Sequence, residues 1–335
     1  MTPTVLYPET EQIPDESIER EIYGRDILMV RRKVGVLGEL SDEDCREVNG
    51  LAIQRYAVTA QDLERFPRLK VIVRMGVGVD RLDRAAAAAR GVLICNVPDY
   101  GTTEVADHAM ALVLSLRRGI LLYHDRMREK PPFWELSTEE PIRRLGIETF
   151  GIIGLGRIGT AVALRARAFG FRVLFYDPYL PNGAELALGV GRARTLDALL
   201  KESDVLSIHA PLTPETRGML GSSELALMPK GAVVVNTARG PIVDLDALLA
   251  ALREGHIAGA GIDVLPVEPP VEPIPELLRA YRAREKGLAG RLVMTPHAAW
   301  LSAQSERDTR TKAAETMRAA LLTNRPQNVI TPEMV

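Results

Sequence analysis

A histidine held behind a proline is the first residue of this chain that could do chemistry. In TPHAAWLSAQ, residues 295–304, His297 follows Pro296, and Trp300 comes three positions later. An imidazole can donate or accept a proton near neutral pH, so His297 is a candidate acid or base. The alternative for this pair is a structural histidine packed beside a buried indole.

A glycine-rich turn could bind the phosphates of a dinucleotide. In ETFGIIGLGRIGTAVALRARAFGFRVLFYDPY, Gly154, Gly156 and Gly159 lie between a predicted strand and a predicted helix. Gly154 would make a tight turn, Gly156 would admit a pyrophosphate, and Gly159 would allow close helix packing. Asp177, at the end of the next strand, would bind the adenosine ribose hydroxyls and repel a 2′-phosphate. This combination predicts a dinucleotide site that prefers NAD over NADP, whereas the glycines alone would also fit ordinary turns.

Two arginines could hold a carboxylate. Arg239, in VVVNTARGPIVD, lies just past the carboxyl end of a predicted strand, where open α/β sheets bind their ligands. Arg74, in VRMGVGVD, precedes a glycine turn whose backbone N–H groups, at Gly76, Val77 and Gly78, could bind a carboxylate beside the guanidinium. The alternative for Arg74 is a surface ion pair next to a plain strand-to-helix turn.

The elements that must position these residues follow from hydrophobic periodicity. Short β-branched runs alternate with helical patterns, which predicts parallel sheets with helices on both faces. The clearest predicted strands are 71–73, 93–94, 151–153, 173–175, 205–208, 233–235 and 292–294. The Pro-rich PVEPPVEPIP (266–275) predicts an extended surface loop, and ELLRAYRAREKG after it predicts a short amphipathic helix. With 335 residues, 46% of them hydrophobic, we expect two domains.

Composition excludes several classes of partner. Lys+Arg number 42 against 44 Asp+Glu, with no basic tail, so we expect no binding of nucleic acid or of an anionic membrane. Cys45 and Cys95 are isolated, which predicts neither a disulfide framework nor a cysteine-rich metal site. The N-terminal residues show no signal pattern, and the apolar runs are too short to span a bilayer. These features predict a soluble cytoplasmic protein without a bound metal.

Five motifs in order resemble one enzyme family. The glycine motif with Asp177, SIHAPLTPETRGML, NTARGPIVD, GAGIDVLPVEP and TPHAAW resemble the D-isomer-specific 2-hydroxyacid dehydrogenases, from about Leu69 to the C-terminal helix. Within the family, VALRARAFGFRVLFYDPYLPNG and PHAAW look most like the C-terminal-binding-protein branch, which contains NADH-binding corepressors in animals and dehydrogenase-like relatives in bacteria. The N-terminal 65 residues and the segment between Glu268 and His297 depart from the family pattern.

The resemblance implies an α/β fold in which one domain is inserted in another. A Rossmann NAD-binding domain, 98–297, would interrupt a discontinuous flavodoxin-like substrate (catalytic) domain, 1–97 and 298–335, across a cleft. A helix over 107–118 would be the first of the NAD domain. The arm 123–145, with Phe133 and Trp134, is where such proteins form homodimers, and simple intrachain packing is the alternative for these two aromatic residues.

The resemblance also assigns roles residue by residue. His297 would donate the proton to the incipient alkoxide, Glu268 would orient the ring through its other nitrogen and favour the imidazolium, and Arg239 would grip the substrate carboxylate. Glu268 could equally be a solvated loop acid. Trp300 would shape the pocket around the substrate side chain, or else pack the domain hinge. The resemblance places these residues at the cofactor: Thr102, Gly154, Gly156, Arg157, Ile158, Gly159, Asp177, His209, Pro211, Thr216, Thr237, Ala238 and Asp263.

Asp263 would accept from the nicotinamide carboxamide, whereas His108, His124 and His256 match no catalytic motif and are interpreted as structural or solvated. The predicted function is NAD-dependent reduction of a 2-oxo acid with an apolar or thioether side chain, such as 4-methylthio-2-oxobutyrate. An NADH-gated corepressor-like binding protein is the alternative. A phosphoglycerate dehydrogenase is disfavoured because the sequence ends soon after its returning helix.

Overall fold

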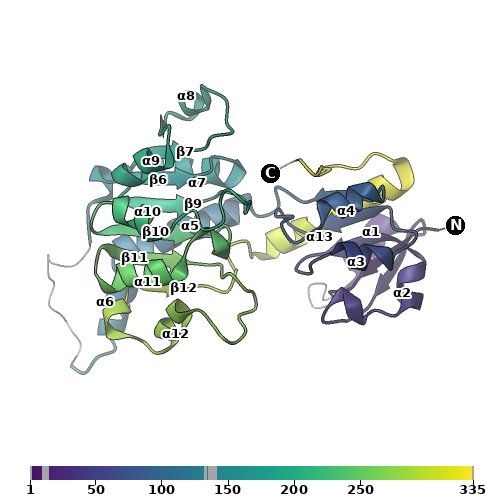
Figure 1. Cartoon of the computed structure of the whole chain (residues 1–335), viewed down its shortest axis with the longest axis horizontal. Helices are drawn as coiled ribbons and strands as arrows, with labels where there is room; N and C mark the ends of the chain where they lie inside the picture. The colour runs from purple at the N-terminus through teal and green to yellow at the C-terminus, as the bar shows by residue number, and fades with distance from the viewer. Residues whose placement is uncertain (1, 10–14, 132–133, 135–141, 334–335) are drawn as a thin grey trace. The chain divides into compact units, whose positions relative to one another are not determined.

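The chain forms two compact units, one of which is inserted in the sequence of the other. The computed structural model describes residues 2–9, 15–131, 134 and 142–333. One unit comprises residues 1–101 and 301–335, and the other comprises residues 102–300 (Figure 1). The boundaries predicted from the sequence lie between residues 97 and 98 and between residues 297 and 298, whereas those of the structure lie after residues 101 and 300. Each unit is described separately below.

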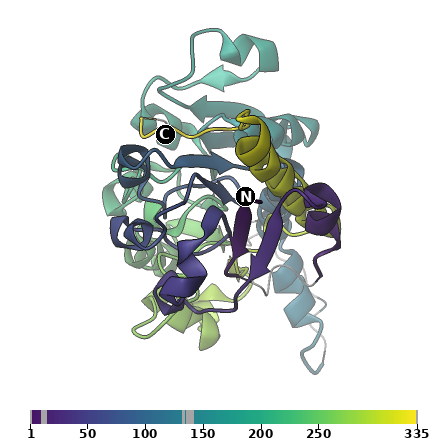
Figure 2. The ribbon, with the colours of Figure 1, turned by 90° about the vertical axis from the view of Figure 1, so that its right-hand side faces the viewer.

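The first unit is built on a five-stranded parallel sheet. Its strands are β1 (Thr4–Tyr7), β2 (Leu28–Arg31), β3 (Val48–Ile53), β4 (Val71–Arg74) and β5 (Leu93–Asn96), in the order β2-β1-β3-β4-β5. This is the flavodoxin-like strand order, which the resemblance implied. Helices α1 (Ser17–Tyr23) and α13 (Ala303–Arg318) cover one face, while α2 (Asp42–Arg46), α3 (Ala60–Glu64) and α4 (Arg84–Ala89) cover the other (Figure 2).

A buried ion pair fastens the C-terminal helix of this unit to its N-terminal part. Arg310 of α13 donates from Nε and Nη2 to the two carboxylate oxygens of Glu19 in α1, at 2.9 and 2.7 Å. Both side chains are almost fully buried. Because an unpaired charge at such a depth would be costly, this pair makes the two chain ends depend on each other for folding.

The second unit is built on a seven-stranded parallel sheet. Its strands are β6 (Thr149–Ile153), β7 (Arg172–Tyr176), β8 (Gly191–Arg192), β9 (Val205–Ile208), β10 (Ala232–Asn236), β11 (Ile257–Ile262) and β12 (Leu292–Met294). The order is β12-β11-β10-β9-β6-β7-β8, so the direction of winding reverses between β6 and β9. This is the doubly wound Rossmann arrangement that the sequence predicted.

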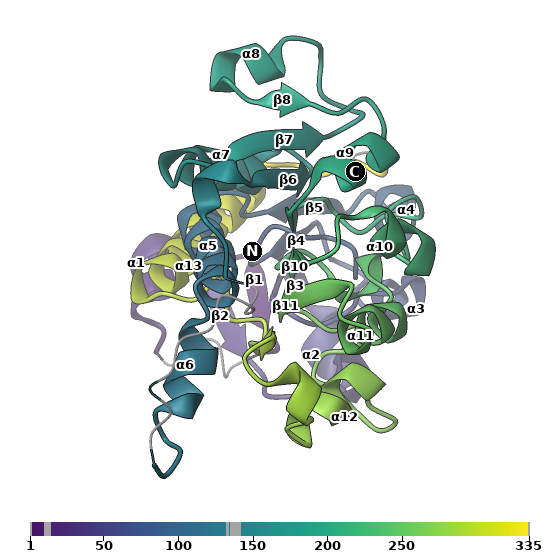
Figure 3. The same cartoon turned by 90° about the vertical axis from the view of Figure 1, so that its left-hand side faces the viewer.

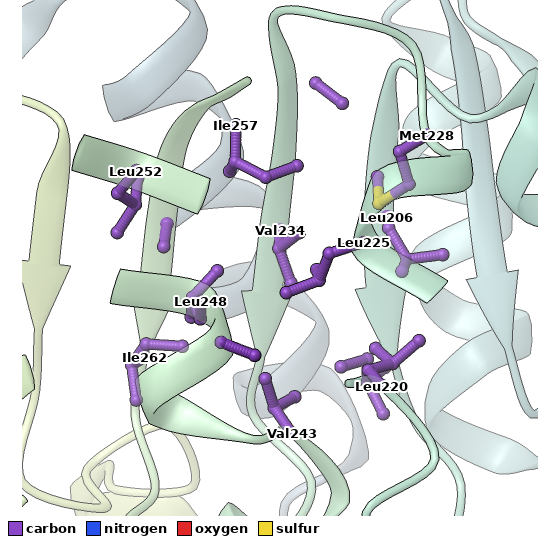
Figure 4. Close-up of a cluster of buried hydrophobic side chains, with 14 of the residues drawn as sticks. Leu206, Leu220, Leu225, Met228, Val234, Val243, Leu248, Leu252, Ile257 and Ile262 are labelled. Carbon is purple, nitrogen blue, oxygen red and sulfur yellow. The ribbon is translucent and has the colours of Figure 1, made fainter. Parts of the chain in front are cut away.

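Helices cover both faces of this sheet. The helices α5 (Thr102–Arg117) and α7 (Arg157–Ala168) lie on one face, and α9 (Leu196–Glu202), α10 (Ser222–Leu227) and α11 (Leu245–Arg253) lie on the other (Figure 3). The sequences VLSI of β9 and AVVVN of β10 are buried throughout, as strands covered on both faces must be. Leu225 of α10 and Leu248 of α11 pack over Val234 of β10 in one of the two cores (Figure 4).

Most of the predicted elements are present, and the strands 205–208 and 292–294 have the predicted bounds. All seven predicted strands exist, each within a strand of three to five residues. Residues 266–275 form neither helix nor strand, and α12 (Glu276–Arg282) follows them, as predicted. The first helix of the second unit begins at Thr102 rather than at residue 107. No helix in the described part of the chain is long and apolar enough to cross a membrane.

Shorter elements complete the two units. They are α6 (Ile120–Arg126), α8 (Ala184–Leu188), the 3-10 turns η2 (Leu37–Glu39), η3 (Leu145–Ile147), η4 (Gly240–Ile242) and η5 (Lys286–Leu288), and the π-helical turn η6 (Ala319–Thr323). No residue of α6 is buried; its first residue, Ile120, is exposed, as are Met127 directly after the helix and Trp134. Phe133 lies outside the described residues. Dimer formation through this arm stays a prediction, which a measurement of molar mass in solution would test.

Candidate active site

The candidate site lies where the strands of the second unit end. In a doubly wound parallel sheet, ligands bind beyond the carboxyl ends of the strands, at the point where the strand order reverses. Here that point lies between β6 and β9. The segments that follow β6, β7, β9, β10, β11 and β12 contain nearly all the predicted cofactor and catalytic residues. The topology therefore gathers segments that are far apart in the sequence at one edge of the sheet.

The glycine turn after β6 has the geometry that a pyrophosphate requires. Gly154 has φ +84°, and a Cβ on it would lie 2.8 Å from the backbone nitrogen of Ala210. A Cβ on Gly159 would lie 2.0 Å from the carbonyl oxygen of Gly154, so the helix packs directly on the turn. A Cβ on Gly156, in contrast, would meet no atom within 4 Å. Two glycines thus shape the turn, while the third leaves open space at the N-terminus of α7 for an anion.

Asp177 supports this turn and remains partly exposed. It follows β7, and its Oδ2 accepts a hydrogen bond from the backbone N–H of Leu155, at 2.9 Å, inside the glycine turn. Its Oδ1 accepts from the N–H of Tyr179, at 3.0 Å. Because each carboxylate oxygen can accept a second hydrogen bond, Asp177 can hold the turn and still bind ribose hydroxyls.

Predicted cofactor residues after β9 and β10 line the same edge of the sheet. His209 shares a 2.8 Å hydrogen bond with Ser207, and burial lowers the pKa of His209 to about 3, so its ring is neutral. The hydroxyl of Thr216 donates to the carbonyl of Pro211 at 2.6 Å and fixes that loop. Thr237 Oγ1 is buried and has no hydrogen-bond partner within the described residues. A buried hydroxyl without a partner is costly, which fits a residue that a bound cofactor would satisfy.

The remaining predicted cofactor residues begin or follow elements of this unit. Thr102 is the first residue of α5, Arg157 and Ile158 are the first two residues of α7, and Ala238 follows β10 at a distance of two positions. Their roles at the cofactor stay predictions. No cluster of metal-ligating side chains occurs within the ranges that the structure describes.

A close backbone approach brings the turn of Arg239 to the loop after β11. Asn236, the last residue of β10, donates from its side chain to the carbonyl of Arg239, at 2.9 Å, and fixes the turn. Arg239 then leads into η4, where a Cβ on Gly240 would lie 2.1 Å from the carbonyl carbon of Leu265. Only glycine permits this approach. As a result, Arg239 is held beside the loop that continues to Glu268.

Glu268 and His297 form a hydrogen-bonded pair. Nδ1 of His297 lies 2.7 Å from Oε2 of Glu268, and the side chains are 36% and 20% exposed. Oε1 of Glu268 accepts from the backbone N–H of Leu265, at 2.8 Å, which fixes the carboxylate. Because a carboxylate only accepts, the ring carries its proton on Nδ1 and keeps Nε2 for another partner. The structure thus brings together two of the three predicted catalytic residues in direct contact.

The backbone of His297 is unusual. Its φ is +54°, a conformation that costs energy in a residue with a side chain. The surrounding hydrogen bonds hold it there. The N–H of His297 donates to the carbonyl of Asp263 at 2.7 Å, while the carboxylate of Asp263 accepts from the N–H groups of Ala298 (Oδ1, 2.9 Å) and Ala299 (Oδ2, 3.0 Å). Such over-determination of a strained residue is typical of functional sites.

This geometry gives Asp263 a role that the sequence did not predict. Its side chain is fully buried, and its two oxygens accept three hydrogen bonds, the third from Thr295 Oγ1 at 2.6 Å. In the structure Asp263 therefore fastens the segment 295–299, which we call the His297 loop. The predicted contact with a nicotinamide carboxamide stays a prediction.

Sequence reasoning missed His108. It lies on α5, and its Nε2 is 3.0 Å from Thr295 Oγ1 and 3.8 Å from Asp263 Oδ1. No local signal could reveal this contact, because the two partners are 187 positions apart and His108 belongs to no catalytic motif.

The predicted substrate residues are divided between the two units. In the first unit, Arg74 ends β4 and folds over Gly76, where a Cβ would collide with its guanidinium. The carbonyl of Val77 accepts from the Asn96 side chain at 2.7 Å, so the turn that also contains Gly78 is fixed. Trp300 is the last residue of the second unit and is half-buried.

Fold and site together define a class of protein: a two-unit α/β protein whose doubly wound unit carries a dinucleotide turn beside a carboxylate–histidine pair and an arginine. Comparison with known proteins identifies the family within this class. Residues 110–299 match the family model described as "D-isomer specific 2-hydroxyacid dehydrogenase, NAD binding domain". The chain belongs to the D-isomer specific 2-hydroxyacid dehydrogenase family, and this unit is its NAD-binding domain.

Individual relatives agree with this assignment. The chain is 36% identical over 274 residues to a D-3-phosphoglycerate dehydrogenase of Methanocaldococcus jannaschii, covering 82% of the chain and 49% of the relative. It is 38% identical over 265 residues to the D-3-phosphoglycerate dehydrogenase of Mycobacterium leprae, covering 79% and 47%. The chain thus spans about half the length of these curated relatives. A D-lactate dehydrogenase from Aquifex aeolicus, solved with NAD and lactic acid, superposes with a TM-score of 0.82 at 28% identity, covering 99% of the chain and 100% of that structure.

Proposed function

We propose that the protein is an NAD-dependent D-2-hydroxyacid dehydrogenase that reduces a 2-oxo acid. The observation that carries the proposal is the 2.7 Å contact between His297 and Glu268, on a strained loop at the carboxyl edge of the NAD-binding sheet. A binding site for a dinucleotide alone needs no such pair. A reaction that delivers a proton beside the cofactor does need one.

In this reaction NADH, when bound, supplies the hydride to the carbonyl carbon of the substrate. His297 donates a proton from Nε2 to the carbonyl oxygen, and in the reverse direction it takes the proton back. Glu268 accepts from Nδ1–H, holds the ring in one orientation and stabilises the charged imidazolium. The reduction consumes the proton that the ring carries on Nε2.

Arg239 supplies the positive charge that the substrate carboxylate needs. Its position after β10, beside the loop of Glu268, is fixed by Asn236 and by the close approach at Gly240. A guanidinium can bind a carboxylate with two parallel hydrogen bonds, which orients the neighbouring carbonyl group toward the proton donor. In this proposal Arg239 binds the substrate carboxylate, His297 donates the proton, and Glu268 orients the ring of His297.

The variant His297→Gln tests the proton donor. We expect kcat for reduction to fall about 100-fold or more, while the affinity for NADH stays nearly unchanged, because glutamine keeps an N–H donor for Glu268 but supplies no acidic proton. His256→Gln is the matched control, since His256 hydrogen-bonds the Leu225 carbonyl in the same unit, away from the site. A His297→Gln enzyme that keeps most of its turnover would remove His297 from this role.

The substrate class we propose is a 2-oxo acid with an apolar or thioether side chain. The support is Trp300, which follows the His297 loop and offers a large apolar face to a substrate side chain. Arg74 and the turn at Gly76, Val77 and Gly78 stay predicted substrate residues. On this proposal 4-methylthio-2-oxobutyrate is preferred over glyoxylate.

Truncation of the indole tests this preference. Trp300→Ala should lower kcat/KM for 4-methylthio-2-oxobutyrate by roughly 1 to 3 kcal/mol and affect glyoxylate much less, because a side-chain contact discriminates only between substrates that touch it. The measurement is kcat/KM for both substrates, together with the melting temperature. Equal losses for both, with a lowered melting temperature, would mean that Trp300 holds the hinge instead.

A second candidate is an NADH-gated binding protein like the corepressors of the C-terminal-binding-protein branch. The segment VALRARAFGFRVLFYDPYLPNG favours it, and the branch keeps the catalytic residues. The two candidates differ in turnover rather than in NADH binding. Either would prefer NADH to NADPH, because Asp177, directly after β7, would bind the ribose hydroxyls and repel a 2′-phosphate.

A further inference from the structure

A chain of three hydrogen-bonding groups reaches the His297 loop from α5. Thr295 Oγ1 lies 2.6 Å from Asp263 Oδ1 and 3.0 Å from His108 Nε2. A hydroxyl has one proton, and a carboxylate can only accept. Thr295 must therefore donate to Asp263 and accept from His108, which fixes the proton of His108 on Nε2.

The last group in this series of hydrogen bonds is Asp263, which holds the His297 loop in place. The Asp263 carboxylate is fully buried and accepts from Thr295, Ala298 and Ala299, while the carbonyl of Asp263 accepts from His297 itself. Serial hydrogen bonds in a low-dielectric interior polarise one another, so donation from His108 to Thr295 strengthens the hydrogen bond from Thr295 to Asp263. His108 is three-quarters buried, which keeps water from replacing it freely.

We propose that His108 is a positioning residue for His297, acting through Thr295 and Asp263. It belongs to the helix that opens the NAD-binding unit, and its ring nitrogen Nε2 contacts Thr295. Its effect is to stabilise the loop in which His297 has φ +54°. The inference rests on the proposed function only in that a displaced His297 would be a poorer proton donor.

Two variants separate hydrogen bonding from packing. His108→Phe keeps a ring of similar size and removes the donor, whereas His108→Gln keeps an N–H donor on a flexible side chain. We expect His108→Phe to lower kcat for reduction roughly tenfold with little change in the KM for NADH, and His108→Gln to recover most of that loss. Thr295→Val, which removes the central hydroxyl at nearly constant volume, should resemble His108→Phe. His256→Gln is again the matched control.

Amide hydrogen exchange gives a readout that does not depend on turnover. In His108→Phe, peptides that cover residues 295–299 should exchange faster than in the wild type and in His256→Gln, while those of β9 and β10 should not change. Unchanged exchange in the loop overturns the inference, whatever the kinetics are. Equal impairment of His108→Phe and His108→Gln overturns it as well, because packing alone would then explain the effect. Absence of turnover in the wild type, with faster loop exchange in His108→Phe, would contradict the proposed function and leave the positioning role in place.

Discussion

At the level of single residues, the neutral ring of His209 couples stability to pH. Burial lowers the pKa of His209 to about 3, whereas an unfolded chain would titrate it near its ordinary value of about 6.5. Below about pH 6.5 His209 becomes protonated in the unfolded state but stays neutral in the folded state. The contribution of His209 is therefore fully present above about pH 6.5 and is lost as the pH falls toward 3.

This difference gives a quantitative expectation. Between pH 8 and pH 5 the wild type should lose about 2 kcal/mol more in free energy of unfolding than His209→Asn, in which no group titrates at this position. Urea unfolding of both proteins without cofactor at several pH values measures it. Parallel pH profiles for the two proteins would show that His209 does not resist protonation in the folded state.

Residue patterns predicted one part of the site and missed another. Arg239, Glu268 and His297 were predicted as catalytic because they belong to ordered motifs, and the contact between the last two is present in the structure. The contact of His108 with Thr295 has no counterpart in any local pattern, since it depends on how α5 packs against the end of β12. The three hydrogen bonds that the carboxylate of Asp263 accepts could not be foreseen either, because all three donors lie on a later loop: the hydroxyl of Thr295 and the N–H groups of Ala298 and Ala299.

At the level of elements, two glycines of the strand–turn–helix after β6 should have different roles. We expect Gly159 to matter for the stability of the fold and Gly156 for the binding of the cofactor. Gly159→Ala places a methyl group 2.0 Å from the carbonyl oxygen of Gly154, so we expect a loss of about 1–3 kcal/mol in stability from overpacking. Gly156→Ala meets no atom within 4 Å, and its cost should stay under about 1 kcal/mol, the size of a changed helix N-cap.

Affinity for NADH should follow a different order from stability. Gly156→Ala should weaken NADH binding by roughly tenfold or more, because its methyl group fills the space where the pyrophosphate approaches the backbone. Titration calorimetry and thermal unfolding of the two variants check this pair of statements. A Gly156→Ala protein that binds NADH as the wild type does would place the phosphates elsewhere.

The strand β11 was not among the clearest predictions because of its glycines, and the structure explains why they are there. The sequence IAGAGI of β11 has two glycines, which are depleted in strands. In the structure a Cβ on Gly259 or Gly261 would lie 3.0 Å from Leu116 or Leu112 of α5. The strand therefore needs glycine because the first helix of the unit packs closely against it, and that requirement arises from tertiary structure, which periodicity does not contain.

At the level of the whole molecule, the resemblance predicted more than periodicity could. Alternating strands and helices predicted parallel sheets, but the return of the C-terminal helix to the first unit depends on contacts such as Arg310 with Glu19, nearly 300 positions apart. The family model covers residues 110–299, so family membership supplies the NAD-binding domain. It does not supply the substrate, because the chain spans about half the length of the curated relatives it matches.

The central claim is that this chain turns over a 2-oxo acid with NADH. The most direct measurement is the oxidation of NADH by the purified protein with 4-methylthio-2-oxobutyrate, pyruvate, glyoxylate and the 2-oxo acid that corresponds to D-3-phosphoglycerate, with NADPH in parallel. We predict turnover that yields one D-2-hydroxy acid per NADH consumed, fastest with the thioether substrate, and at least about tenfold better in kcat/KM with NADH than with NADPH. Tight binding of NADH without turnover of any of these acids would contradict the claim and favour a binding protein.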